Sequence, residues 1–72
     1  MDTKQMVAMT FIKPEHGNVN VATVEENMEE VKEYAEQQGY HLKGFSNIDV
    51  SEKQYHSTLK KGYKMLFKPS DK

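Results

Sequence analysis

The side chains that could carry out chemistry in this chain are carboxylates, histidines and lysines, because the 72-residue sequence contains no cysteine. Without thiols, the chain cannot form a catalytic cysteine or a zinc or iron–sulfur site with cysteine ligands. Its histidines, His16, His41 and His56, lack the paired spacing of metal ligands, although Glu52 lies one helical turn before His56. A Glu/His pair at that spacing is more often a surface pair than half of a metal site. We therefore predict no metal site and no cofactor.

The sequence also lacks the patterns that indicate an enzyme. It contains neither of the glycine-rich phosphate-binding motifs, and its serines have no evident base and orienting acid. The carboxylates crowd onto one segment, where nothing would desolvate one of them and raise its pKa for acid catalysis. A domain of this size also has little room for a substrate pocket. We predict that the protein is not an enzyme.

The carboxylates are concentrated in the first half of the chain. Residues 1–36 carry three lysines against eight carboxylates, whereas residues 37–72 carry seven lysines against three, so the overall net charge of −1 hides a dipole. One interpretation of the acidic run is a solvated face that keeps the protein in solution. The other is a binding surface for a basic protein partner. The residues of that predicted surface are Glu25, Glu29, Glu30, Glu33 and Glu36.

The lysines of the second half have two interpretations of their own. One is that they block edge-to-edge aggregation of a strand, a common use of lysine. The other is that they contact the phosphates of a nucleic acid. The sequence has no arginine, the side chain best shaped for bidentate recognition of phosphate and guanine. A nucleic-acid patch is therefore the alternative hypothesis. Its residues would be Lys60, Lys61, Lys64 and Lys68.

The acidic residues are positioned by the clearest predicted element, an amphipathic helix from Val24 to Gln38. Thr23 and Glu26 have the spacing of a capping box at its start. Gly39 followed by Tyr40 predicts a left-handed Schellman ending. The apolar residues that recur at helical spacing are Val24, Met28, Val31 and Ala35.

The segment Gln5 to Lys13 reads as a strand that is apolar on both faces, which is typical of a central strand. The following residues 13–18 contain proline, glycine and asparagine, so we expect the chain to reverse there. Residues 19–21 alternate over a short distance and predict a return strand, which would complete a hairpin. The sheet therefore begins with two neighbouring antiparallel strands.

Residues 40–50 predict a further strand. Phe45 breaks its alternation beside Gly44, which indicates a β-bulge that re-aims the aromatic side chain. Residues 62–68 read as a last strand, with Tyr63, Met65 and Phe67 on its inner face.

The stretch between these two strands allows two structures. Ser51 and Gln54 have the spacing of a capping box, which predicts a short helix from about Glu52 to Lys61 that ends at Gly62. The alternation of Tyr55, Ser57 and Leu59 instead favours a strand that turns at Gly62. The helix is the preferred prediction.

Together these elements predict one α+β domain over residues 1–72, a three- or four-stranded sheet with the helix packed on one face. No apolar run approaches the length of a membrane span, and the first residues lack a signal-peptide core, so we expect a cytoplasmic protein without membrane contact. A chain this short buries only about 60% of its unfolded surface, and self-association is a common remedy. We expect a homodimer that uses the sheet face opposite the helix. The residues of this predicted dimer face are Met6, Ala8, Ile12 and Leu66.

The run EEVKEYAEQQGYHLKGF, followed by GYKMLFKP, resembles small uncharacterised strand-helix-strand-strand proteins of Gram-positive bacteria and their phages. The resemblance covers roughly residues 25–69 and implies no function. A phage association would imply a small protein that binds and modulates a host protein, by analogy. The leading hypothesis is a non-enzymatic protein-interaction or regulatory module, and the rival is a nucleic-acid-binding protein.

Overall fold

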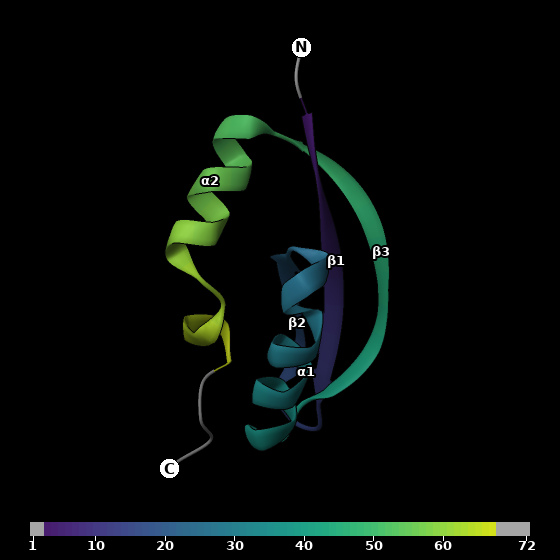
Figure 1. Cartoon of the computed structure of the whole chain (residues 1–72). Coiled ribbons are helices and arrows are strands. Elements are labelled where there is room, and N and C mark those ends of the chain that lie inside the picture. The colour runs from purple at the N-terminus through teal and green to yellow at the C-terminus, as the bar shows by residue number, and fades with distance from the viewer. Residues whose placement is uncertain (1–2, 68–72) are drawn as a thin grey trace.

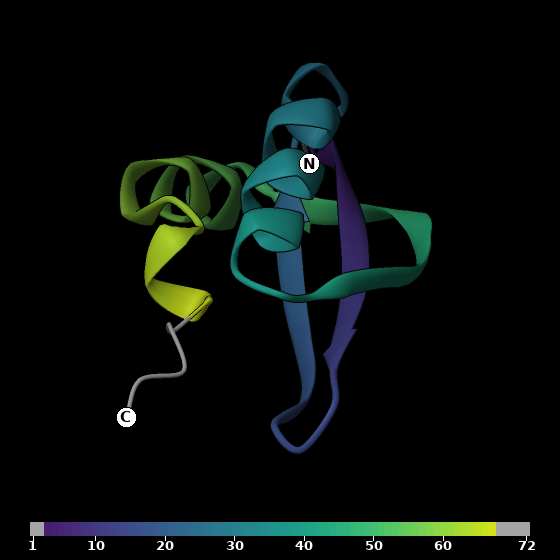
Figure 2. The same ribbon diagram turned by 90° about the horizontal axis from the view of Figure 1, so that it is seen from below.

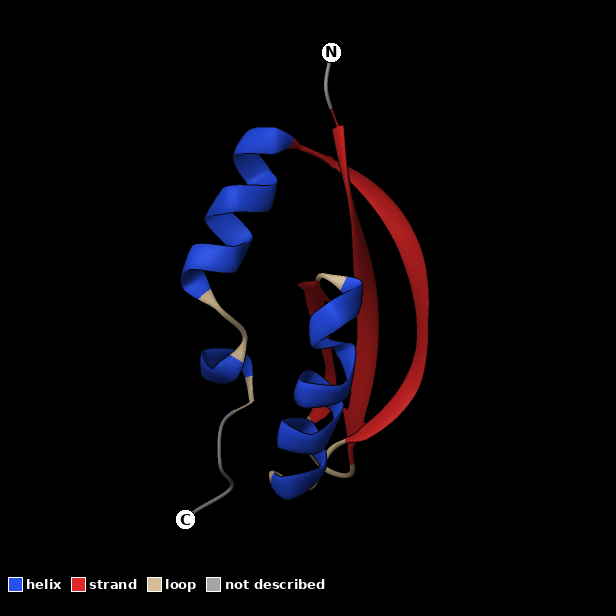
Figure 3. Ribbon diagram, in the orientation of Figure 1, coloured by secondary structure: helices blue, strands red, loops and turns tan. Residues whose placement is uncertain are grey.

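The computed structural model of the protein describes residues 3–67, which form a three-stranded antiparallel sheet and two helices (Figure 1). Figure 3 shows the helical segments on one side of β1 and β3. The predicted α+β class is confirmed. In chain order, the elements are β1 (Thr3–Lys13), β2 (Gly17–Thr23), the 3-10 helix η1 (Glu25–Asn27), α1 (Met28–Gln37), β3 (His41–Ser51), α2 (Glu52–Lys61) and the 3-10 helix η2 (Lys64–Leu66).

The central strand of the sheet is β1, as its two apolar faces predict, because the strand order is β2-β1-β3. The predicted hairpin is confirmed. Its paired residues run from Val7 opposite Thr23 to Lys13 opposite Gly17. In the turn, the His16 N–H donates to the Lys13 carbonyl over 3.0 Å, and Glu15 and Gly17 both have positive φ.

The strand β3 is long and curved, and its predicted bulge is confirmed. Thr10 faces Gly44 and Phe11 faces Leu42, so Lys43 is the extra residue that shifts the register. Seen from below, β3 bends around the outside of β1 before it reaches α2 (Figure 2). Phe45, two residues beyond the bulge residue, has 60% of its surface exposed.

The helix predicted at residues 24–38 begins with η1, which continues into α1, so 13 residues are helical. The predicted capping box at its start is wrong. Thr23 is buried as the last residue of β2, opposite Val7, and Val24 takes the N-cap position. Pairing with the central strand therefore prevails over the local cap.

The predicted Schellman ending of α1 is confirmed. Gly39 has a φ of 90°, and its N–H donates to the Glu36 carbonyl over 3.0 Å. The Tyr40 N–H reaches the Ala35 carbonyl over 2.9 Å. These two bonds are the ones that a left-handed glycine allows at a helix end, and they turn the chain directly into β3.

The segment after β3 is the helix α2, so the strand alternative for it is wrong. The Ser51 hydroxyl accepts a hydrogen bond from the Gln54 N–H over 3.1 Å, as the second capping box predicts. The helix ends before Gly62, which has a φ of 77°. The N-cap, which is a local signal, therefore favours the helix over the strand in this segment.

The strand predicted at residues 62–68 is wrong. The chain forms η2 instead, and Phe67 then enters the core with only 1% of its surface exposed. Tyr63 packs against the same core, whereas Met65 between them is 78% exposed. The helical turn brings Tyr63 and Phe67 inward and leaves Met65 outside, whereas strand alternation would direct all three side chains to the same face.

The core lies between α1 and one face of the sheet. At its centre, the ring of Phe67 meets those of Phe11, Tyr40 and Tyr34 edge to face, with centroids 5.2, 5.1 and 5.9 Å apart. Edge-to-face contacts are a preferred aromatic geometry. The last described residue therefore joins β1, α1 and the residue between α1 and β3.

Candidate interaction surfaces

The acidic residues of α1 form an exposed stripe. The helix buries Val31 and Ala35, and the helical repeat places Glu29, Glu33 and Glu36 on the opposite side, where all three are exposed. We call these three residues the acidic stripe. They repel one another at three- and four-residue spacing, at a cost of a few tenths of a kcal/mol per pair.

Glu30 lies outside this stripe, on the flank of α1 that faces η2. Its carboxylate accepts a hydrogen bond from the Tyr63 hydroxyl over 2.9 Å. Partial burial raises the pKa of Tyr63 to about 12, and the hydrogen bond to Glu30 and the negative charge of Glu30 add to this effect. Glu30 thus holds the segment that follows α2 against α1.

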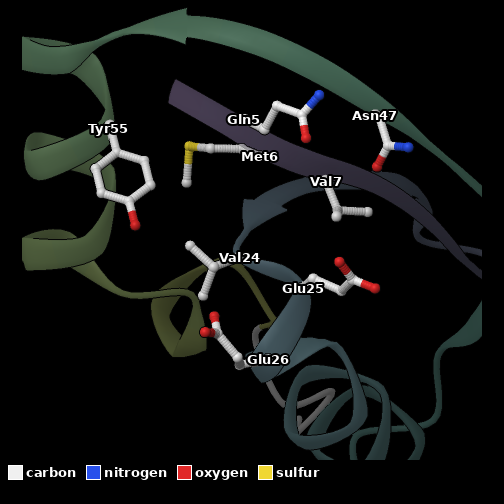
Figure 4. A pocket seen from close by; sticks show the side chains of 8 residues that line it. All are labelled: Gln5, Met6, Val7, Val24, Glu25, Glu26, Asn47 and Tyr55. Atoms are coloured by element: carbon white, nitrogen blue, oxygen red, sulfur yellow. The ribbon is translucent and has the colours of Figure 1, made fainter. Parts of the chain in front are cut away.

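Glu25 belongs to a third environment, an open hollow of about 430 Å³ between β1, η1 and α2 (Figure 4). Tyr55 projects into it from α2, and the carboxylates of Glu25 and Glu26 come from η1. Carboxylates, amides and a phenol give it hydrogen-bonding capacity and negative charge. Its lining residues are Gln5, Met6, Val7, Val24, Glu25, Glu26, Asn47 and Tyr55.

The structure does not assemble the predicted dimer face. Met6 has only 1% of its surface exposed, and Ala8 and Ile12 are half-buried. Leu66 is not on the sheet but in η2. The prediction of this surface is therefore wrong, because α2 packs against β1 and the chain covers part of the sheet itself. The homodimer itself stays a prediction.

The described lysines of the alternative patch lie on α2 and η2, after the acidic stripe in the chain. Lys60 and Lys61 are in the last turn of α2, where the helix dipole favours positive charge. Lys64 begins η2, and its ammonium lies 5.5 Å from the centre of the Tyr34 ring. Lys68 falls outside the described residues.

Beside these lysines is an exposed apolar surface. Met65 is 78% exposed and Leu66 47% exposed, and both line a shallow hollow of about 170 Å³. We call its lining residues the apolar–lysine patch: Thr58, Lys61, Gly62, Met65 and Leu66. The alternation of residues 62–68 concealed this patch, since it places Met65 inside. The four-residue spacing of Tyr63 and Phe67 fits a strand as well as a helical turn, so the sequence held no signal that separates the two.

Three smaller findings concern the described residues. In the part of the chain that the structure covers, no three carboxylate or imidazole side chains gather closely enough to hold a metal ion. Glu52 and His56 lie 3.8 Å apart on the exposed side of α2. Neither helix within residues 3–67 has the length and apolar character needed to cross a membrane.

Comparison with known proteins found no similar protein: no family model matches the sequence, and no curated protein or solved structure is significantly similar to it.

Proposed function

We propose that the chain is a non-enzymatic protein-interaction module that binds its partner through the apolar–lysine patch. The observation that carries this proposal is the exposure of two neighbouring large apolar side chains, Met65 and Leu66. Exposed apolar residues that gather in a hollow with a polar rim are typical of protein-binding surfaces. Methionine suits such a surface because its side chain is flexible and polarizable.

The same patch favours a protein partner over a nucleic acid. Single-stranded nucleic acids bind to lysines interleaved with exposed aromatic rings, on which the bases stack. Here the centre of the patch is aliphatic. The nearby rings of Tyr34 and Tyr63 pack against each other, with centroids 5.8 Å apart. The lysines therefore flank an apolar contact surface.

The chemistry of the patch indicates its partner. Lys61 lies in the hollow, and the exposed Lys60 and Lys64 neighbour it in the chain. A fitting partner presents apolar side chains for Met65 and Leu66 and carboxylates for the lysines. The acidic stripe is the second surface, for a basic partner. Because it carries no apolar anchor, its charges contribute to orientation and association rate more than to affinity.

The test compares the proteins that three immobilised forms of the chain retain from a lysate. Those retained by the wild type should be lost with the Met65→Ser/Leu66→Ser variant and kept by the matched Glu29→Gln/Glu33→Gln/Glu36→Gln variant. Circular dichroism checks that each variant is folded. Equal retention by the patch variant and the wild type would contradict the proposal.

A second measurement addresses the rival function. Fluorescence anisotropy with labelled single- and double-stranded DNA and RNA at low salt should show no saturable binding. Binding that weakens linearly in log salt, and is lost with Lys60→Gln/Lys61→Gln/Lys64→Gln, would favour the nucleic-acid alternative instead.

A further inference from the structure

We infer that a second copy of this chain pairs with β3, antiparallel and edge to edge, so that two three-stranded sheets join across a two-fold axis at Ser46. β3 is the end strand in the order β2-β1-β3, and no described element lies beyond it in Figure 1. An edge strand of 11 residues presents a row of unpaired backbone donors and acceptors. This edge replaces the sheet face that the sequence predicted for the dimer.

The geometry of antiparallel pairing limits the possible registers. Facing residues must both direct their N–H and C=O groups toward the partner strand, or both away from it. That direction alternates along a regular strand, so the numbers of two facing residues differ by an even number. In a symmetric pair of identical strands, the residue halfway between them then faces its own copy and lies on the two-fold axis. Residues 44–51 form such a regular stretch, because they pair with β1 without a register shift.

The side chains of β3 favour Ser46 as the residue on the axis. This register places Phe45 opposite Asn47, and the two copies of Phe45 become diagonal neighbours within reach of each other. Phe45 is 60% exposed in the single chain, so this contact would cover it. Lys43, the bulge residue just beyond the regular stretch, comes near Asp49 of the other copy, and both residues are exposed.

The neighbouring registers lack this complementarity. With Phe45 on the axis, only Gly44 separates the axis from the bulge at Lys43. In that register Lys43 faces the neutral Asn47. With Asn47 on the axis, the Asp49 carboxylate faces the Phe45 ring. Only the Ser46 register of these three combines unlike charges with an aromatic contact, and both contacts occur twice by symmetry.

The inferred interface is independent of the proposed function. In Figure 1, β3 lies on the side of the sheet away from α2 and η2, which carry the apolar–lysine patch. A dimer through β3 therefore leaves both copies of the patch free. Loss of the dimer and loss of partner binding can then be measured separately.

Disulfide trapping tests the register directly, because the natural chain has no cysteine. Facing Cα atoms are about 4.5–5.5 Å apart, within the range that a disulfide spans. Under mild oxidation Ser46→Cys should therefore form a covalent dimer. In the matched control Asn47→Cys, the two thiols are diagonal neighbours with Cα atoms about 7–8 Å apart and should cross-link far more slowly.

Charge reversal gives a second, non-covalent test. Sedimentation velocity at high micromolar concentration should show a dimer for the wild type. Lys43→Asp and Asp49→Lys should each weaken it about tenfold, because two pairs change at once, and the double variant should restore it. A wild-type monomer at that concentration would overturn the inference. So would cross-linking of Ser46→Cys no faster than Asn47→Cys, or failure of the folded double variant to recover.

Discussion

At the scale of single residues, the most informative contact is the one between Tyr63 and Glu30, 33 positions apart in the sequence. It fixes the segment after α2 to α1, and it uses one acidic residue that the sequence assigns to partner binding. The Lys64 ammonium over the Tyr34 ring strengthens the same junction. Residue types that suggested binding surfaces thus serve in part to close the fold.

Replacing Tyr63 with phenylalanine tests this contact. At neutral pH we expect Tyr63→Phe to lower the free energy of unfolding by about 0.5–1 kcal/mol, as for a solvent-accessible hydrogen bond. Because folding raises the pKa of Tyr63 from 10.0 to about 12, its contribution is fully present below about pH 10 and is lost as the pH rises through about 12.

The measurement is urea unfolding of the wild type and the variant at pH about 8 and at pH about 11.5, below and within the range in which Tyr63 titrates. The stability difference should shrink at the higher pH. Tyr55→Phe is the control, because Tyr55 also carries a hydroxyl but lines the hollow, whereas the Tyr63 hydroxyl bonds to Glu30. A pH-independent difference for Tyr63→Phe would contradict the assignment.

At the scale of elements, the ends of the helices show which signals are local. The Ser51 cap and the Gly39 ending act within a few residues, and both form as predicted. The Lys13 ammonium adds to the ending of α1, since it donates to the Gln38 carbonyl over 2.9 Å. The ending therefore joins the β1 hairpin to the helix.

An alanine at position 39 tests this junction. The left-handed φ of 90° costs a non-glycine residue about 1–2 kcal/mol, and the new Cβ would come within 3.3 Å of the Lys13 side chain. We expect Gly39→Ala to lower the free energy of unfolding by about that amount. In the control Gly44→Ala, the added Cβ meets nothing within 4 Å, so the change should stay within about 0.5 kcal/mol. Equal effects in urea unfolding would contradict this explanation.

At the scale of the whole molecule, the segment after α2 closes the fold. Phe67 contacts rings from β1 and α1 and the tyrosine that begins the passage into β3. The acidic and basic residues that are separated along the sequence also lie on different elements of the fold. The acidic stripe lies on the outer side of α1, and the lysines lie on α2 and η2.

Truncation of the Phe67 side chain should therefore affect the entire domain. We expect Phe67→Ala to cost about 3–5 kcal/mol, as for other buried phenylalanines, out of about 4–10 kcal/mol for a domain of this size. The neighbouring Leu66→Ala is the control, because Leu66 is 47% exposed and should change stability little. Thermal unfolding followed by circular dichroism measures both. A Phe67→Ala variant as stable as the control would show that Phe67 does not close the core.

The features that can be predicted from the amino-acid sequence are those whose free energy is local or periodic. These were the α+β class, the central position of β1, the bulge beside Gly44, and the helix signals at Gly39 and Ser51. Each depends on residues within a few positions of one another, so the physical cause is visible in the chain. The acidic stripe also belongs here, because the helical repeat alone places its three carboxylates together.

For the remaining residues, several contact partners compete, and long-range packing selects among them. Thr23 pairs with β1 instead of capping the helix, and Met6 is buried where the chain covers its own sheet. Phe67 enters a core built from distant segments, which leaves Met65 and Leu66 exposed. These outcomes depend on contacts between residues far apart in the sequence. For that reason both candidate surfaces, the apolar–lysine patch and the β3 edge, became visible only in the folded chain.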